Sequence, residues 1–274
     1  MLRSTPEEVS AILAKREIFI EKIPWYKPAF VLPQVSAKTV LESDLTIEGK
    51  VYAQGLESML AVLALNPQPG ENVLDLCAAP GSKTSQIAAH MNNEGSLIAN
   101  EPVQNRFYRL KSVVDLMGAK AKLSMKDGRY LRSTADFDRI LVDAPCSSEG
   151  RFLETEPKSY AYWSLRKIHE MAHKQKGLLL NASRLLKPGG TMVYATCTFA
   201  PEENEAVIDW FLRKTQGELA LSPIEISDVP RYPALQAFAG KTFNADVSHC
   251  LRVLPNQHME GFFLAKFVRA WNNH

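Results

Sequence analysis

Two cysteines stand where an apolar, strand-like run of the sequence gives way to small and polar residues. Cys146 follows the run that ends at Val142, and Cys197 follows the run that ends at Ala195. A third run of the same form leads into Cys77. Open α/β sheets bind ligands outside the carboxyl ends of their strands. The sequence therefore predicts one site at one sheet edge, with thiols that are able to act as nucleophiles.

The loop after Cys77 consists mainly of small residues, which let a ligand approach the backbone and the free amides of a helix start. It contains one glycine, Gly81, so it is not a GxGxxG dinucleotide loop. Ser82 rather than glycine precedes Lys83, so it is not a Walker A loop either. We therefore expect a ligand other than a dinucleotide or a nucleoside triphosphate.

Two carboxylates follow the next two predicted strands. Glu101 follows the strand 96–99, near the place where Rossmann-like folds put a ribose-binding carboxylate, and Asp127 follows a strand near 121–124. A small-residue loop and two acids in this order suit an adenosine-bearing cofactor without a diphosphate. S-adenosylmethionine fits this pattern better than NAD does.

Each of these features by itself has a structural explanation. A free cysteine is most often a small buried apolar residue, and an acid such as Asp143 at the end of a strand often caps a turn. Taken together, however, these features indicate a functional site. Cys146 and Cys197 at the ends of neighbouring strands, beside Asp143 and opposite a cofactor loop, favour catalysis.

Short apolar strands alternate with amphipathic helices, which is typical of a parallel sheet with crossover helices. We expect helices over 5–16, 56–65, 83–91, 105–117, 164–186 and 201–215, and strands over 73–76, 96–99, 121–124, 140–142, 192–195, 251–254 and 262–268. Pro201 and the acids after it are expected to start the last helix, and 217–248 to be mainly loop. The predicted fold class is α/β: a Rossmann-like, mostly parallel sheet of about seven strands with helices on both faces.

Composition limits the kind of protein. Prolines interrupt residues 1–50, which we expect to form a small N-terminal lobe ahead of a catalytic domain over 51–274. The formal net charge is +2, and the four cysteines have no CxxC spacing, so we expect reduced thiols and no metal site. No apolar run approaches the ~18 residues that span a bilayer. We expect a cytoplasmic protein without a membrane partner, and a monomer.

Three motifs, in order along the chain, resemble the signatures of the NSUN/RsmF family of S-adenosylmethionine-dependent RNA cytosine-5 methyltransferases. They are DLCAAPGSKT at 75–84, DAPCSSEG at 143–150 and YATCTFAPEEN at 194–204. Shorter similar segments lie at 23–25, 52–59, 252–255 and 260–263, so the resemblance covers nearly the whole chain. Ser82 stands where many relatives have glycine. The sequence of residues 80–101 resembles most closely the bacterial ribosomal-RNA branch of the family. The resemblance implies a class I methyltransferase fold, in which 1–50 is a reduced RNA-binding subdomain.

The resemblance also implies roles for the residues of the motifs. Cys197 would add to C6 of a cytosine, Asp143 would hydrogen-bond the base and share a proton near N3, and Cys146 would help to release the product. The cofactor would be held by Cys77, Ala78, Ala79, Pro80, Gly81, Ser82, Lys83, Glu101, Arg106, Asp127 and Asp143. The residues themselves leave the nucleophile open, because DNA cytosine-5 methyltransferases use the cysteine of a Pro-Cys pair, which is Cys146 here.

The segment 162–190 has a net charge of +5 and follows the aromatic Tyr160. Its basic residues are Arg166, Lys167, Lys174, Lys176, Arg184 and Lys187, against one acid, Glu170. Such a segment either contacts RNA phosphates and bases or is a solvated helix face. We expect an RNA partner, with ribosomal RNA favoured and transfer RNA as the second possibility.

Three other functions are weighed against this one. A non-catalytic RNA-binding or ribosome-assembly factor would not need both Cys146 and Cys197. A DNA cytosine methyltransferase would leave Cys197 without a role. A nicotinamide dehydrogenase does not fit the single-glycine loop.

Overall fold

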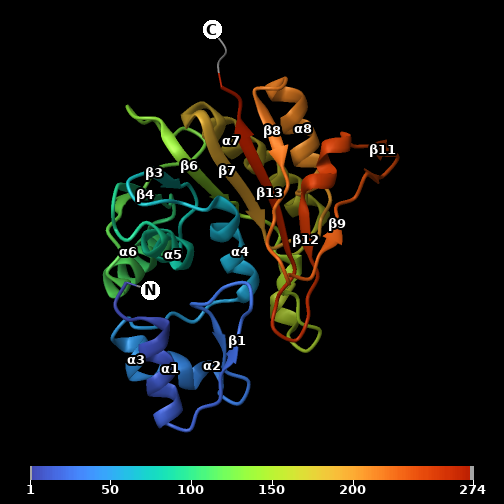
Figure 1. The fold of residues 1–274 in the computed structure, drawn as a ribbon. Helices are drawn as coiled ribbons and strands as arrows, with labels where there is room; N and C mark the ends of the chain where they lie inside the picture. Colours follow the sequence, from blue (N-terminus) through green and yellow to red (C-terminus); the bar gives the residue numbers. More distant parts are fainter. Residues whose placement is uncertain (1, 272–274) are drawn as a thin grey trace.

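The computed structural model describes residues 2–271, which form a small lobe and a larger α/β part (Figure 1). The lobe contains α1 (Pro6–Lys15), β1 (Glu21–Lys22), β2 (Phe30–Val31), α2 (Ala37–Leu41) and α3 (Asp44–Ile47). Helix α1 begins with a capping box, in which the side chains of Thr5 and Glu8 each accept a hydrogen bond from the other residue's backbone N–H. Val9, Leu13 and Leu45 form the apolar centre of the lobe. The division of the chain at residue 50 stays a prediction.

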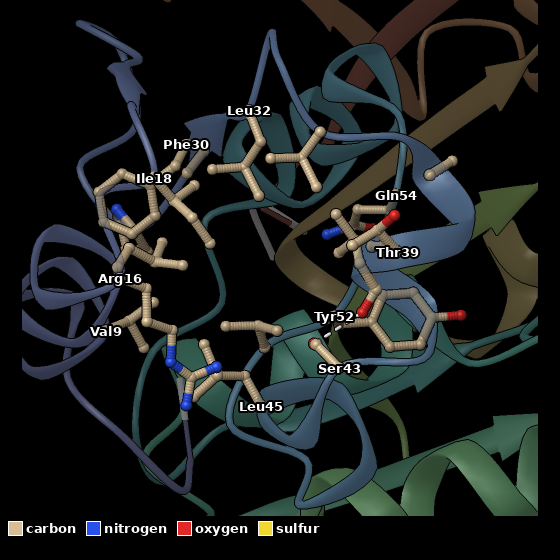
Figure 2. Close-up of a pocket in the computed structure, with 18 of the residues that line it drawn as sticks. Val9, Arg16, Ile18, Phe30, Leu32, Thr39, Ser43, Leu45, Tyr52 and Gln54 are labelled. Atoms are coloured by element: carbon tan, nitrogen blue, oxygen red, sulfur yellow. Dashed lines mark hydrogen bonds between the residues drawn. The ribbon is translucent and has the colours of Figure 1, made fainter.

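An apolar cavity of about 340 Å³ lies between the lobe and the segment that leads into α4 (Leu56–Leu65). Figure 2 shows Arg16 and Ile18 on one side of this cavity and Tyr52 and Gln54 on the other. Side chains therefore fill this junction incompletely, in contrast to the usual close packing of a protein interior.

The larger part is built on one sheet. Its strands include β3 (Asn72–Asp75), β4 (Ser96–Asn100), β5 (Lys122–Ser124), β6 (Phe137–Asp143), β7 (Leu186–Thr196), β8 (Leu219–Ser222), β9 (Tyr232–Pro233), β12 (Leu251–Val253) and β13 (Phe262–Arg269). The order is β5-β4-β3-β6-β7-β13-β12-β9, and β8 also pairs with β13. The strands from β5 to β7 run parallel, and β13 is antiparallel to β7. This confirms the mostly parallel sheet.

Among the described residues the sheet has nine strands, not about seven, so that expectation was low by two. The two strands that were not expected are β8, which pairs with the second half of the long strand β13, and the two-residue strand β9, which pairs with β12. The stretch 217–248 also holds more than loop, since β8, β9, a hairpin of β10 (Ala237–Phe238) and β11 (Lys241–Thr242), and a 3-10 helix (Ala245–His249) lie there. Strands of two to four residues are too short to show a clear period of two in the sequence.

Helices cover both faces of the sheet, as expected. α4 and α5 (Ser82–His90) pack against Val73, Leu141 and Val193, and α6 (Gln104–Met117) packs beside α5. α7 (Leu165–Leu185) and α8 (Glu205–Thr215) pack on the other face, against Leu74 and Ile140. Both faces of these strands are buried, which explains their continuous apolar runs. No helix within residues 2–271 is both long and apolar enough to cross a bilayer.

Helix α8 begins at Glu205, not at Pro201, so its predicted start was wrong by four residues. The acids before it do not simply favour the helix dipole. Glu203 is buried and accepts a hydrogen bond from Gln175, and Glu205 forms a buried ion pair with Arg252 at 2.6 Å. The chain bends here so that these carboxylates reach partners across the domain.

Candidate active site

The loops that carry the predicted chemistry leave neighbouring strands at the same edge of the sheet. Strands β3, β6 and β7 are adjacent and parallel, with Asp75 opposite Leu141 and Asp143 opposite Ala195. The pairing continues one residue beyond β6, because Ala144 N–H donates to Ala195 O at 2.9 Å. The register therefore brings the Cys77, Cys146 and Cys197 loops to one place.

The two cysteine sulfurs lie side by side. Cys146 Sγ is 3.4 Å from Cys197 Sγ, and Ser148 Oγ is 3.6 Å from Cys197 Sγ. Gly150 ties the two loops together, since its N–H donates to Cys197 O at 2.9 Å. A Cβ on Gly150 would lie 2.3 Å from Gly261 O, so no larger residue fits at this close approach. The loops are thus held where the two thiols contact each other.

The two thiols differ in acidity. The hydrogen bond from Cys146 lowers the pKa of Cys197 to about 7, helped by the positive charge of Arg151 and opposed by burial. The same hydrogen bond, together with burial, raises the pKa of Cys146 well above its usual value. Near neutral pH a large fraction of the molecules therefore holds a Cys146 thiol that donates to a Cys197 thiolate. A thiolate is the nucleophilic form of cysteine.

Asp143 and Lys83 form an ion pair beside the thiols. Lys83 Nζ is 2.7 Å from Asp143 Oδ2, and the lysine is buried while the carboxylate stays partly exposed. The ammonium group of Lys83 also lies 5.6 Å from the centre of the Phe262 ring. Lys83 comes from the start of α5 and Asp143 from the end of β6, so this pair links the cofactor loop to the thiol loops. One oxygen of Asp143 is left for a further partner.

The cofactor loop has a compact backbone. Gly81 adopts φ +116°, where glycine is strongly favoured, and a Cβ there would lie 3.0 Å from Val113. Arg106 donates to Ala79 O at 2.9 Å and lies 3.5 Å from Glu101, which is almost fully buried. The predicted loop residue Cys77 is buried enough that its pKa is raised, so it is not a nucleophile.

The predicted acids lie at successive strand ends. Glu101 follows β4 and Asp127 follows β5, as the sequence indicates. Asp127 is held by Arg129 at 2.6 Å, and the hydrogen bond from this arginine lowers the pKa of Asp127. The structure thus brings Cys77–Lys83, Glu101 and Arg106 together in direct contact. It adds an arginine that already binds Asp127.

Several residues of the site are not identified from the sequence. Asp75 at the end of β3 accepts from Thr84 at 2.7 Å, and burial raises the pKa of this carboxyl to about 7. Glu203 accepts from Ser147 N–H at 3.2 Å and from Gln175 at 2.7 Å. The signal for Asp75 is present, because it opens the first motif. Gln175 lies far along the chain from its partners and carries no such signal.

Comparison with known proteins agrees with this geometry. A family model described as 16S rRNA methyltransferase RsmB/F matches residues 62–268. The tRNA (cytosine(49)-C(5))-methyltransferase of Pyrococcus abyssi is 37% identical over 273 residues, covering 97% of this chain and 85% of that protein. The ribosomal RNA small subunit methyltransferase F of Pectobacterium atrosepticum is 36% identical over 261 residues, covering 92% of this chain and 51% of that protein.

The fold is shared with solved methyltransferases. The crystal structure of a methyltransferase homolog protein from Pyrococcus horikoshii superposes with a TM-score of 0.83 at 30% identity, covering 97% of this chain and 83% of that one. The chain thus spans most of its archaeal relatives but about half of the bacterial one. The class I methyltransferase fold is confirmed. The chain belongs to the 16S rRNA methyltransferase RsmB/F family, whose members are S-adenosylmethionine-dependent RNA cytosine-5 methyltransferases.

Proposed function

We propose that this chain transfers a methyl group from S-adenosylmethionine to C5 of a cytosine in RNA, through a covalent bond between Cys197 Sγ and C6 of the base. The observation that carries the proposal is the paired thiols. The two sulfurs lie 3.4 Å apart, within hydrogen-bond distance, and the pKa of Cys197 is lowered to about 7. A nucleophile of this kind is what addition to a pyrimidine ring requires.

The residues at the strand ends fit the cofactor. The buried carboxylate of Glu101 at the end of β4 suits the ribose hydroxyls, and the 78–81 turn carries only small residues and a proline, none of them large enough to shield its backbone. Asp75 Oδ1 is buried with no hydrogen-bond partner among the described residues, and it faces the same strand edge. S-adenosylmethionine, when bound, supplies the methyl group that an activated C5 accepts. Asp127 and Asp143 remain proposed members of this cofactor site.

Cytosine C5 is a weak nucleophile until something adds to C6. The Cys197 thiolate forms the Sγ–C6 bond, and the electron pair of the C5–C6 double bond moves toward N3. Asp143 takes a proton from Lys83 Nζ, 2.7 Å away, and donates it to N3 of the base. The base becomes enamine-like, with nucleophilic character at C5. The target cytosine has to be single-stranded or flipped out of a helix to reach these groups.

Release of the product needs a base for the proton on C5. In the resting protein the Cys197 thiolate keeps its neighbour Cys146 protonated, because it accepts the Cys146 proton and repels a second negative charge. Once Cys197 is bonded to carbon, this cause of the raised pKa is gone. Cys146 then gives its proton to solvent, and the resulting thiolate removes the proton on C5. The electron pair of that C–H bond forms the C5–C6 double bond as the Sγ–C6 bond breaks and Cys197 leaves as a thiolate. The two cysteines thus act in sequence.

The assignment is tested by trapping. RNA that contains 5-azacytidine has nitrogen in place of C5, so an adduct with C6 cannot be resolved by loss of a C5 proton. The wild-type protein and the C146A variant are expected to form a denaturation-resistant complex with this RNA, and C197A to form none. Denaturing electrophoresis and peptide mass spectrometry would locate the bond. An adduct that persists in C197A and disappears in C146A would reverse the two roles.

We propose ribosomal RNA as the favoured substrate and transfer RNA as the second candidate. The description of the family model and the bacterial relative support ribosomal RNA, whereas the archaeal relative acts on transfer RNA. Identities of 37% and 36% are too close to separate the two. Bisulfite sequencing of total RNA from cells with and without the gene distinguishes them. A lost 5-methylcytosine in transfer RNA alone would contradict the ribosomal assignment.

A further inference from the structure

A second hollow of the surface lies on the side of α7 away from the thiols. It has a volume of about 470 Å³ and lies between the loop after β5, the middle of α7 and α8. We call it the α7 pocket. Its lining includes Arg129, Tyr130, His173, Lys176, Arg184 and Trp210. The pocket combines several cations with two aromatic rings.

The basic residues of the 162–190 segment differ in whether a carboxylate pairs with them. Lys167 pairs with Glu170 and Lys187 pairs with Asp138, so their charges are already balanced. Within residues 2–271, no carboxylate pairs with Lys176 or Arg184. The pocket therefore holds positive charge that lacks a protein counter-charge, which favours an anion.

A further lysine increases this excess. Burial, together with the charge of Lys241 on β11, lowers the pKa of Lys176. Lys241 comes from the β10–β11 hairpin, far along the chain from α7. Like charges brought together in this way repel each other, and a bound anion would relieve the repulsion. The fold thus concentrates cations from distant segments around one hollow.

One aromatic ring of the pocket, that of Tyr130, is available for stacking, whereas Trp210 packs partly against the core. Tyr130 is 72% exposed, and the Arg129 guanidinium lies 5.4 Å from its ring centre. Lys176 Nζ lies 5.3 Å from the ring centre of Trp210. Exposed rings beside cations are the usual means by which proteins hold unpaired nucleotides, because any base has a face to stack.

The pocket is linked to the active site through shared elements. Gln175 on α7 donates to Pro145 O at 3.0 Å in the Cys146 loop, so the next residue, Lys176, points to a different side of the helix. Arg129, on the rim, binds Asp127 of the proposed cofactor site. The pocket and the Cys146 loop therefore contact different sides of one helix.

We propose that the α7 pocket binds one nucleotide of the substrate RNA outside the active site, with its phosphate on Lys176 and Arg184 and its base on Tyr130. This inference rests on the proposed function, in which RNA is the substrate. Of the basic residues in the 162–190 segment, it assigns RNA binding to Lys176 and Arg184, and it adds the ring of Tyr130 from outside that segment. It also predicts that affinity depends on RNA length beyond the target cytosine.

The proposed phosphate contact is tested with the double variant K176E/R184E, by titrating a labelled single-stranded RNA of about 30 nucleotides at several KCl concentrations. We expect affinity to fall roughly tenfold or more, and the slope of log K against log salt to decrease by about 1 to 2. The matched control is K122E, an exposed lysine on the edge strand β5. Wild-type affinity and slope in the double variant, or an equal loss in K122E, would overturn the pocket.

The proposed stacking of the base on Tyr130 is tested with the variant Y130A. We expect affinity for the same RNA to fall several-fold with an unchanged salt slope, because a ring releases no counterions. Unchanged affinity would overturn the placement of the base. Competition with cytidine monophosphate distinguishes a site for a free nucleotide from a site for a nucleotide within RNA. Displacement of the long RNA by micromolar cytidine monophosphate would indicate a free-nucleotide site and contradict an RNA site.

These binding measurements do not depend on methyl transfer. Affinity for S-adenosylmethionine, measured by calorimetry on each variant, shows whether the fold is retained. If the wild-type protein bound RNA through this pocket but formed no 5-methylcytosine, the proposed reaction would fail and the pocket would stand. If methyl transfer occurred and K176E/R184E bound RNA like wild type, the reverse would hold.

Discussion

The β6 loop and the β7 loop each bring one cysteine to the same point, yet the surroundings give the two thiols opposite character. The pKa of Cys146 is raised and that of Cys197 is lowered, although the sulfurs are 3.4 Å apart. The hydrogen bond that Cys146 donates to Cys197 is the largest cause of both shifts. The charge of Arg151 further favours the thiolate of Cys197, and the buried carboxylate of Glu203 further disfavours that of Cys146.

The two loops are also held by different partners. Glu203 accepts from Ser147 and Gln175, and so fixes the Cys146 loop. Asn204 serves the other loop, because it donates to Thr198 O at 2.9 Å and accepts from Thr196 at 2.6 Å. One short turn after β7 thus supports both loops through two adjacent side chains.

The largest expected effect separates the two cysteines by kinetics. C197A removes the nucleophile, and methyl transfer is expected to fall by about 10⁴-fold or more, as when other enzymes lose a covalent catalyst. C146A keeps the nucleophile but lacks the base for release. Rapid-quench measurements with labelled cofactor should show one methyl group transferred per protein, followed by very slow turnover.

The proposed division of roles between the two cysteines is contradicted if C197A and C146A lose the first turnover equally. That outcome would mean that the pair works only as a unit, with no division of labour. C77A serves as the control, because Cys77 is buried with a raised pKa and lies in the cofactor loop. Its loss should act on cofactor affinity and leave the order of the two thiol steps intact.

A smaller effect is expected from the support of the Cys146 loop. Q175L removes the hydrogen bonds that Gln175 donates to Glu203 and Pro145 O. We expect the free energy of unfolding to fall by about 2 kcal/mol, since one bond is to a charged group. Turnover should fall about tenfold, while the first-turnover adduct forms at nearly the wild-type rate.

The control for this variant is N181L on the same helix. Asn181 also donates two hydrogen bonds to backbone oxygens, but to Gly128 and Leu131 on another loop. A similar loss of stability is expected, without a change in the ratio of turnover to adduct formation. If N181L changed that ratio as much as Q175L does, general loosening of the fold would explain both.

The sequence predicts the strand ends well because each buried strand is a continuous apolar run followed directly by its functional residues. Cys77, Cys146 and Cys197 all lie where that pattern puts them. The order of strands follows from the alternation of strands and helices, which allows few topologies. The two short strands β8 and β9 add to the sheet without such a pattern.

The electrostatics of the site could not be predicted in the same way. Arg151, in the 3-10 turn Glu149–Arg151 after the Cys146 loop, helps to lower the pKa of Cys197, and no sequence spacing encodes that influence. Glu203 and Glu205 read as acids of a helix start, but they turn inward to bind Gln175 and Arg252. Long-range pairs of this kind depend on tertiary packing, which local patterns do not contain.

The smallest effect concerns the charge that distinguishes the thiols. In R151Q the positive charge near Cys197 is lost, so the pKa of this thiol rises from about 7. The thiolate exists above the pKa, and the rate of iodoacetamide labelling at Cys197 should therefore fall several-fold at pH 7 and match wild type near pH 10. R151K keeps the charge and should keep the wild-type profile. Labelling at each cysteine is followed by peptide mass spectrometry between pH 5 and 10. If Cys197 had the same labelling profile in R151Q as in wild type, Arg151 would not affect its pKa. The difference in pKa between the two cysteines would then depend on which sulfur donates the hydrogen bond between them.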